Sequence, residues 1–184
     1  MVKIIAASAA LLALIGCAHA QAPAQPAQPA PPPPTCEAAA HRAFDFWLGE
    51  WRAYVTGTEN LAGLSSIRSE DAGCVITEHW RSQRGRPYSG RSLNILDRNT
   101  GRWEQFWTDS TGEITHFTGG PLSEGVMRLT AENDREAGNP NPVWNRMTFT
   151  RNADGSVRQH GEQSADSGAT WTTQYDFTYR RAAN

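Results

Sequence analysis

The sequence predicts an all-β domain built as an antiparallel, up-and-down series of about 8–10 short strands. Segments of alternating apolar and polar residues recur at short, even spacing, and clusters of Gly, Pro, Asn and Asp separate them. No long helical pattern interrupts the series, and a short helical lead-in is expected only over residues 36–46. The domain is therefore expected to span residues 36–184, a length typical of one domain.

Each expected strand ends at turn-forming residues, such as Asp71-Ala72-Gly73 or Gly119-Gly120-Pro121. The longest break, residues 133–142, is expected to form a loop at the rim. The strands are expected near residues 50–56, 62–69, 73–82, 88–97, 102–109, 112–119, 125–132, 143–151, 156–164 and 171–180.

The alternation within these strands predicts a barrel with a partly polar interior. Trp103, Gln105, Trp107 and Asp109 share one face of their strand, so aromatic and polar side chains are mixed there. A barrel that encloses a ligand cavity has such a face. The alternative is a solvated outer face that carries aromatic cross-strand pairs.

The N-terminus is typical of an exported protein. Residues 1–20 form a signal peptide, with Lys3 as the positive end and an apolar run too short to span a bilayer. Cleavage after Ala20 is the preferred interpretation. The alternative is a lipoprotein, because Leu14-Ile15-Gly16-Cys17 resembles a lipobox, and only a lipid on Cys17 would then attach the protein to a membrane. Residues 21–35 are rich in proline and are expected to form a disordered linker.

Export determines how the charges and cysteines are interpreted. The net charge is −2, and removing Lys3 with the signal peptide makes it more negative, which argues against a nucleic-acid partner. No other lysine is present, so lysine-centred catalysis is excluded. Cys36 and Cys74 remain as a pair in an oxidising compartment, where a disulfide is expected.

The first strand and the chain end carry a resemblance. Gly49-Glu50-Trp51, together with Arg180 or Arg181, resembles the signature of the calycin superfamily. In that superfamily the Trp closes the barrel floor and a basic side chain near the C-terminus packs across it. The resemblance implies a calycin-like, or lipocalin-like, barrel in which Gly49, Trp51 and one of the two arginines are structural.

A wider set of motifs resembles a group of uncharacterised exported bacterial proteins. The set is Phe44-Asp45-Phe46-Trp47-Leu48-Gly49-Glu50-Trp51, Gly73-Cys74, Glu78-His79-Trp80, Ser92-Leu93-Asn94, Gly101-Arg102-Trp103 with Gln105 and Trp107, and Asn145-Arg146. This resemblance covers roughly residues 41–181 and implies no activity, cofactor or catalytic residue. One departure is His160-Gly161, where an aromatic residue is expected, and it is expected to alter the cavity. Separately, residues 164–171 fit the Asp-box pattern, which stabilises a hairpin.

The residues proposed to contact a ligand lie on the middle strands. They are Glu78, Trp80, Asn94, Gln105, Trp107, Asp109 and Arg146. Aromatic walls with a few fixed polar groups suit a small hydrophobic or amphipathic ligand. Arg146 would pair a ligand carboxylate, or alternatively form a salt bridge with Glu78 or Asp109.

Two other functions are weighed against binding. An envelope hydrolase would use Glu78 or Asp109 as general acid or base, and a structural or protein-interaction barrel would need no cavity. The histidines lack metal-binding spacing, so no metal and no cofactor are expected. Haem held by His116 or His160 is the remaining alternative.

Overall fold

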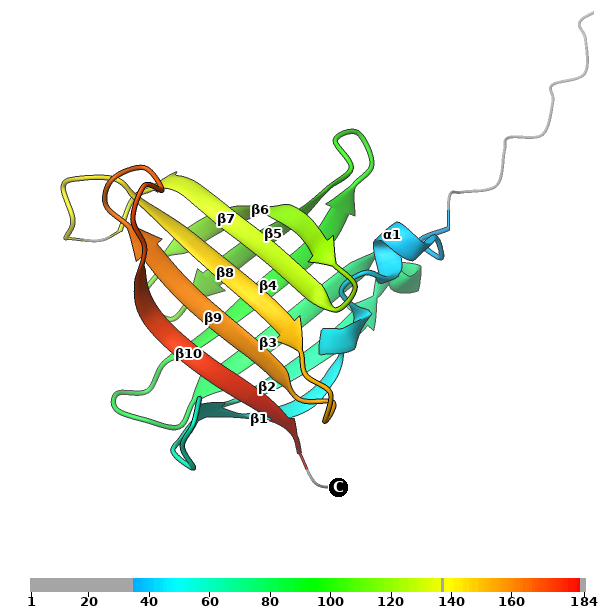
Figure 1. Ribbon diagram of the computed structural model, residues 1–184, viewed down its shortest axis with the longest axis horizontal. Coiled ribbons are helices and arrows are strands. Elements are labelled where there is room, and N and C mark those ends of the chain that lie inside the picture. The colour runs from blue at the N-terminus through cyan, green and yellow to red at the C-terminus, as the bar shows by residue number, and fades with distance from the viewer. Residues whose placement is uncertain (1–34, 137, 183–184) are drawn as a thin grey trace, which may run out of the picture. The chain divides into compact units, whose positions relative to one another are not determined.

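Ten antiparallel strands follow one another around a closed barrel, and the last strand pairs with the first (Figure 1). The computed structural model describes residues 35–136 and 138–182. The strands are β1 (Gly49–Val55), β2 (Leu61–Glu70), β3 (Val75–Ser82), β4 (Ser89–Asp97), β5 (Arg102–Asp109), β6 (Ile114–Ser123), β7 (Val126–Asp134), β8 (Val143–Arg151), β9 (Val157–Ser164) and β10 (Thr172–Arg181). The predicted all-β, up-and-down barrel is confirmed, and closure leaves its sheet without an unpaired edge.

The strand boundaries follow the predicted turns closely, with two exceptions. Gly119-Gly120-Pro121, expected to form a turn, lies inside β6, because the chain reverses only at Gly125, which has a φ of 72°. The strand expected from residue 73 begins at Val75, because a short 3-10 turn, η2 (Asp71–Gly73), precedes it. Asp71, Ala72 and Gly73 all have positive φ angles, of 49°, 55° and 82°. This run of left-handed backbone cannot continue a strand. The expected signal peptide and residues 21–34 of the expected linker lie outside the described residues.

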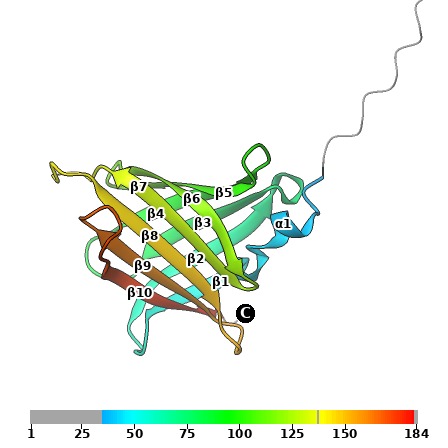
Figure 2. The same cartoon turned by 45° about the horizontal axis from the view of Figure 1, so that its top comes forward.

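The helical lead-in consists of α1 (Ala39–Arg42) and a 3-10 turn, η1 (Asp45–Trp47), at one end of the barrel (Figures 1 and 2). Phe44 and Trp47 have no exposed surface, and their rings stack 5.0 Å apart. Phe149 of β8 packs on both, with centroids 5.0 Å and 4.7 Å away. The lead-in therefore plugs this end of the barrel.

The lead-in is held in place covalently. Cys36 forms a disulfide with Cys74, between η2 and β3, as expected from the sequence. The Trp51 indole also donates a hydrogen bond of 2.8 Å to the Trp47 carbonyl. The plug is thus fastened to both β1 and β3.

The seam between β1 and β10 shows which arginine is the partner of Trp51. Arg181 lies opposite Trp51, with its guanidinium carbon 4.0 Å from the ring centroid. Its Nη1 also donates to the Leu48 carbonyl at 2.6 Å. Gly49, at a φ of 137°, leaves room for this contact, because a Cβ there would lie 1.8 Å from Arg181 Nη1. Arg180 points elsewhere and pairs with Glu59.

The Asp-box residues stabilise the β9–β10 hairpin as predicted. Asp166 accepts hydrogen bonds from Ser164 Oγ and from the amide and hydroxyl of Thr170, over 2.6–2.8 Å. Gly168 takes a φ of 88°, and the Trp171 indole donates to its carbonyl. The motif thus fixes one loop at the rim and takes no part in the barrel interior.

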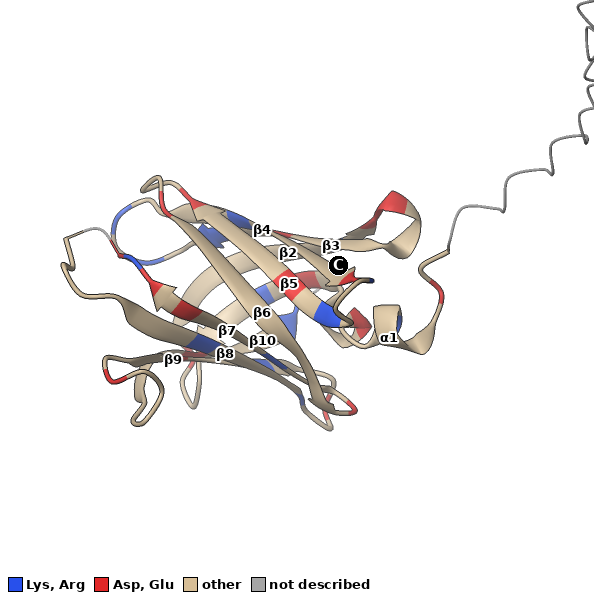
Figure 3. Cartoon of the chain, turned by 90° about the horizontal axis from the view of Figure 1, so that it is seen from above, with Lys and Arg blue, Asp and Glu red and all other residues tan. Residues whose placement is uncertain are grey.

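Acidic and basic residues are interspersed over the strands seen from above (Figure 3). Within the described ranges, no helix has the length and apolarity needed to cross a membrane.

Candidate functional site

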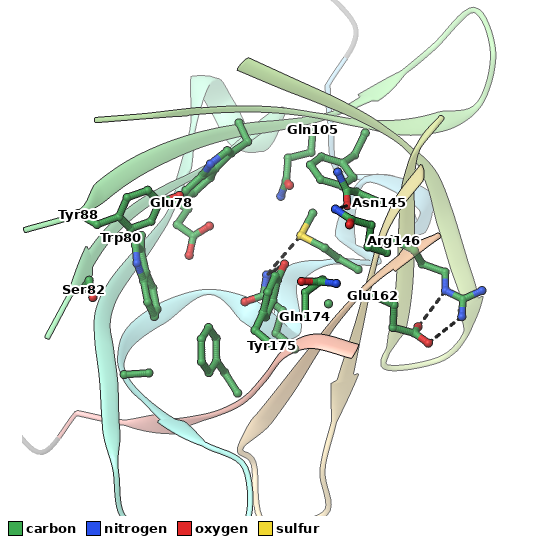
Figure 4. Close-up of a pocket in the computed structure, with 18 of the residues that line it drawn as sticks. Glu78, Trp80, Ser82, Tyr88, Gln105, Asn145, Arg146, Glu162, Gln174 and Tyr175 are labelled. Atoms are coloured by element: carbon green, nitrogen blue, oxygen red, sulfur yellow. Dashed lines mark hydrogen bonds and ion pairs between the residues drawn. The ribbon is translucent and has the colours of Figure 1, made fainter. Parts of the chain in front are cut away.

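The barrel encloses a cavity of about 650 Å³, with its lining side chains drawn in Figure 4. Its mouth lies at the end opposite the plug. The mouth is bordered by the β3–β4 and β7–β8 loops, which contribute Arg84 and Glu136. The aromatic part of the wall comes from both sides of the barrel and consists of Trp80, Tyr88, Trp107, Phe117, Tyr175, Phe177 and Tyr179.

Three of these rings lie flat along the wall because the neighbouring strand has a glycine there. A Cβ on any of these glycines would come within 2.3 Å of the ring atoms, which real contacts never do. Each ring thus occupies the space that a side chain at the glycine would take, and the rings leave the centre of the barrel open. The pairs are Gly63 with Trp80, Gly90 with Trp107, and Gly161 with Tyr175.

Gly161 is the departure noted in the sequence. The Tyr175 ring of β10 occupies the space that an aromatic side chain on β9 would have filled. Tyr175 of β10 therefore supplies the aromatic group of the cavity wall at this position.

Glu78 is the carboxylate inside the barrel, and only 4 % of its surface is exposed. Burial raises its pKa from 4.5 to about 7, although hydrogen bonds from Ser65 and Ser92 oppose the shift. The Ser65 hydroxyl donates to Glu78 Oε1 at 2.7 Å. Both serines lie opposite this part of β3, on β2 and β4. Glu78 is therefore oriented by its neighbours and faces the cavity (Figure 4).

Asn94 and Gln105 form a buried chain of hydrogen bonds that leads to Glu78. Gln105 Nε2 donates to Asn94 Oδ1 at 2.6 Å, and Asn94 Nδ2 donates to Ser92 Oγ at 3.0 Å. Since Ser92 Oγ accepts this bond, its own hydrogen is directed to Glu78. Gln105 reaches the cavity, whereas Asn94 is fully buried behind it and acts by positioning Gln105 and Ser92.

Asp109, at the end of β5, is not among the residues that line the cavity, so the structure does not bring it together with the other predicted ligand contacts. It accepts hydrogen bonds from the Tyr88 hydroxyl at 3.0 Å and from the amide and hydroxyl of Thr111 at 2.8 Å and 2.6 Å. Burial raises its pKa, but the bonds from Thr111 and Tyr88 outweigh burial and hold the pKa below its ordinary value. Asp109 is therefore an ionised group that shapes its own loop.

Arg146 borders the cavity, but its guanidinium is directed away from the centre (Figure 4). It forms two hydrogen bonds of 2.9 Å with Glu162 and lies 3.8 Å from the centroid of the Trp171 ring. The partner is thus Glu162, and neither of the two acids weighed from the sequence. The guanidinium is thus engaged by Glu162 and Trp171.

The wall contributed by β10 was not anticipated. Tyr175, Phe177 and Tyr179 alternate along this strand and all face inward. The Tyr179 hydroxyl donates to Gln159 Oε1 at 2.6 Å and so fixes an amide on the neighbouring strand β9. The alternation of aromatic residues at every second position was the signal in the sequence.

The histidines considered for haem lie on the outer face. His116 stacks on Phe106 with centroids 4.5 Å apart and contacts Glu104 at 2.7 Å. His160 contacts the Thr173 hydroxyl at 2.9 Å. Neither ring borders the cavity. In the part of the chain that the structure describes, no group of three or more His, Cys, Asp or Glu side chains is arranged to bind a metal.

No protein-family model matches the chain, and no curated protein sequence matches it at a significant level. The cavity is therefore the feature of the molecule that bears on function. Its aromatic walls, one buried carboxylate and two fixed amides can enclose a small molecule and select its polar groups.

Proposed function

We propose that this protein binds a small hydrophobic or amphipathic molecule inside its barrel. The observation that carries the proposal is the open cavity of about 650 Å³. Ligand sites for small molecules generally fall between about 300 and 1,000 Å³ and combine apolar walls with a few convergent polar groups. A purely structural barrel would instead fill this space with its own side chains.

The polar groups of the cavity are held before any ligand arrives. Gln105 is fixed by Asn94, Gln159 by Tyr179, and Glu78 by its two serines. Pre-organised groups lose little conformational entropy on binding, so they favour one orientation of the ligand. The aromatic rings supply most of the apolar contact area.

The cell envelope is the proposed location. The Cys36–Cys74 disulfide fits an oxidising compartment, and the sequence predicts an export signal. We also propose kinship with the exported bacterial barrels that the sequence resembles. The contact of Arg181 with Trp51 supports it, because it joins the two parts of the calycin-like signature.

Fluorescence titration tests the binding proposal. N-phenylnaphthylamine is neutral and apolar, and its emission rises when it leaves water. We expect saturable binding with quenching of tryptophan emission, and Trp107→Ala should remove most of that quenching. Trp144→Ala is the matched control, because Trp144 lies on β8 beside the inward-facing Val143 and outside the cavity lining. Absence of saturable binding would contradict the proposal.

A hydrolase remains the second candidate because Glu78 is buried with a pKa of about 7. Such a group exchanges protons readily at neutral pH, as general acid–base catalysis requires. Asp109 does not share this property, since its pKa is lowered. Turnover of nitrophenyl glycosides that disappears in Glu78→Gln would support this candidate, and the absence of turnover would leave binding as the function.

A further inference from the structure

The aromatic rings of the cavity gather around Glu78. Glu78 and Trp80 face inward two residues apart on β3, and Trp107 flanks Ser92 from the other side of β4. From the opposite wall, Phe177 stacks on Trp80 with centroids 5.7 Å apart, and Tyr175 stacks on Phe177 at 5.2 Å. A buried carboxylate thus lies within an aromatic enclosure.

No basic side chain of the cavity lining is available to neutralise this carboxylate. Two arginines border the cavity: Arg84 is exposed on the β3–β4 loop at the mouth, and Arg146 is paired with Glu162. The mouth carries a further carboxylate, Glu136, which accepts hydrogen bonds from Asn145 and Gln163. The field along the cavity therefore favours positive charge.

We infer that the ligand of this barrel carries a positively charged nitrogen on an apolar body, with Glu78 as its counter-ion and Trp80, Trp107 and Tyr175 as its aromatic walls. This inference rests on the proposed function and narrows the ligand class to amphipathic amines and quaternary ammonium compounds. Aromatic faces attract such cations through their quadrupoles, and they do so most strongly where water is excluded.

The two serines alone do not compensate a buried negative charge. Ionised carboxylates in apolar surroundings need a paired cation, and without one they take up a proton. A pKa of about 7 is the expected result for the empty cavity. A cation in the cavity replaces that proton, so binding releases a proton whenever Glu78 starts protonated.

The other titratable groups facing the cavity do not share this behaviour. Burial raises the pKa of Tyr88 to about 12 and those of Tyr175 and Tyr179 above their usual range, so all three stay neutral near pH 7. The charged side chains of Arg84 and Glu136 lie at the mouth, and Asp109, whose pKa is lowered, lies outside the cavity lining. Glu78 is accordingly the group that couples cation binding to pH.

The test compares phenyltrimethylammonium with tert-butylbenzene, which has the same shape and no charge. At about pH 8, we expect the intact barrel to bind the cation about tenfold more tightly or better. Below pH 7 the cation affinity should fall, approaching tenfold per pH unit, while the affinity for tert-butylbenzene stays constant. Glu78→Gln should bring the ratio of the two affinities to about one, whereas Glu104→Gln, on the outer face, should leave it unchanged.

Equal affinities of the wild-type protein for the two probes, or a preference that does not depend on pH, would overturn the cation site. Saturable binding of N-phenylnaphthylamine in that case would leave the proposed function standing. If none of the three probes binds, both proposals fall. The wild-type pH series decides the matter even if Glu78→Gln does not fold.

Discussion

Glu78 links the stability of the barrel to pH. Its pKa is 4.5 when exposed and about 7 when folded, so between these values the folded state retains a proton that the unfolded state has lost. The contribution is fully present below pH 4.5 and is lost as pH rises through about 7. The shift corresponds to about 3 kcal/mol.

Urea unfolding of wild type and Glu78→Gln measures this contribution. We expect the difference in unfolding free energy to shift in favour of the Gln variant as pH rises from 4.5 to 7, by about 3 kcal/mol, and then to level off. Glu104→Gln, which alters an outer carboxylate paired with His116, serves as the control. A difference that does not change with pH would show that the folded carboxyl ionises normally.

Gly161 supports a second residue-level prediction. An added Cβ would lie 2.2 Å from the Tyr175 ring, so Gly161→Ala must displace that ring toward the cavity. Such overpacking costs about 1–3 kcal/mol. Gly120→Ala is the control, because no atom lies within 4 Å of its Cβ position. Thermal unfolding compares the two, and equal midpoints would refute the packing argument.

The lead-in is the element most dependent on a covalent tie. Cys36 and Cys74 are 38 residues apart in sequence, and their bridge shortens the unfolded chain as well as fastening the plug. In the chain-entropy account, a disulfide that closes a loop of this length stabilises the folded state by about 4 kcal/mol. Measured losses on removing native disulfides range from about 2 to 5 kcal/mol.

Replacing both cysteines by serine should therefore lower the unfolding free energy by about 2–4 kcal/mol while the strands still form. Urea unfolding measures the loss, and circular dichroism checks that β structure remains. The unaltered protein in reducing buffer is the control and should show a similar loss. A thiol titration of denatured, non-reduced domain should find no free thiol; finding two would contradict the bridge.

Strands were predictable because their signals are local. Alternation over β5 assigned Gln105 and Trp107 to the inner face correctly, and the turn residues located most boundaries within two positions. The orientation of Arg146 was not predictable, because its partner Glu162 lies on the neighbouring strand and both face outward from the barrel. Sequence alternation gives a face of the strand and leaves open whether that face is the inner one.

At the scale of the whole molecule, the closed barrel was predictable, whereas the sequence left undecided whether its interior is open or filled. Closure follows from many short antiparallel strands and the resemblance around Trp51. An open interior depends on rings such as Trp80 lying against glycines of another strand, as at Gly63. Such pairs are set by strand register, which the sequence specifies only once the barrel has closed.

The seam that completes the barrel gives the last prediction. Arg181 on β10 covers the Trp51 ring on β1 and donates to the Leu48 carbonyl, so it joins the end of the domain to its beginning. Losing a cation–π contact and a hydrogen bond should lower the unfolding free energy of Arg181→Ala by about 1–2 kcal/mol.

Arg180→Ala is the matched control for this seam. Arg180 is the neighbour of Arg181 on β10, and it makes only an exposed ion pair with Glu59 and a contact with the Tyr54 ring. Exposed pairs contribute little, so the expected loss is about 0.5 kcal/mol or less. Hydrogen exchange adds a local readout: amides of β1 and β10 should lose protection in Arg181→Ala, because opening of the seam frees both strands. Equal losses in the two variants would mean that Arg181 contributes only as a surface charge and that closure depends on the backbone ladder between β1 and β10.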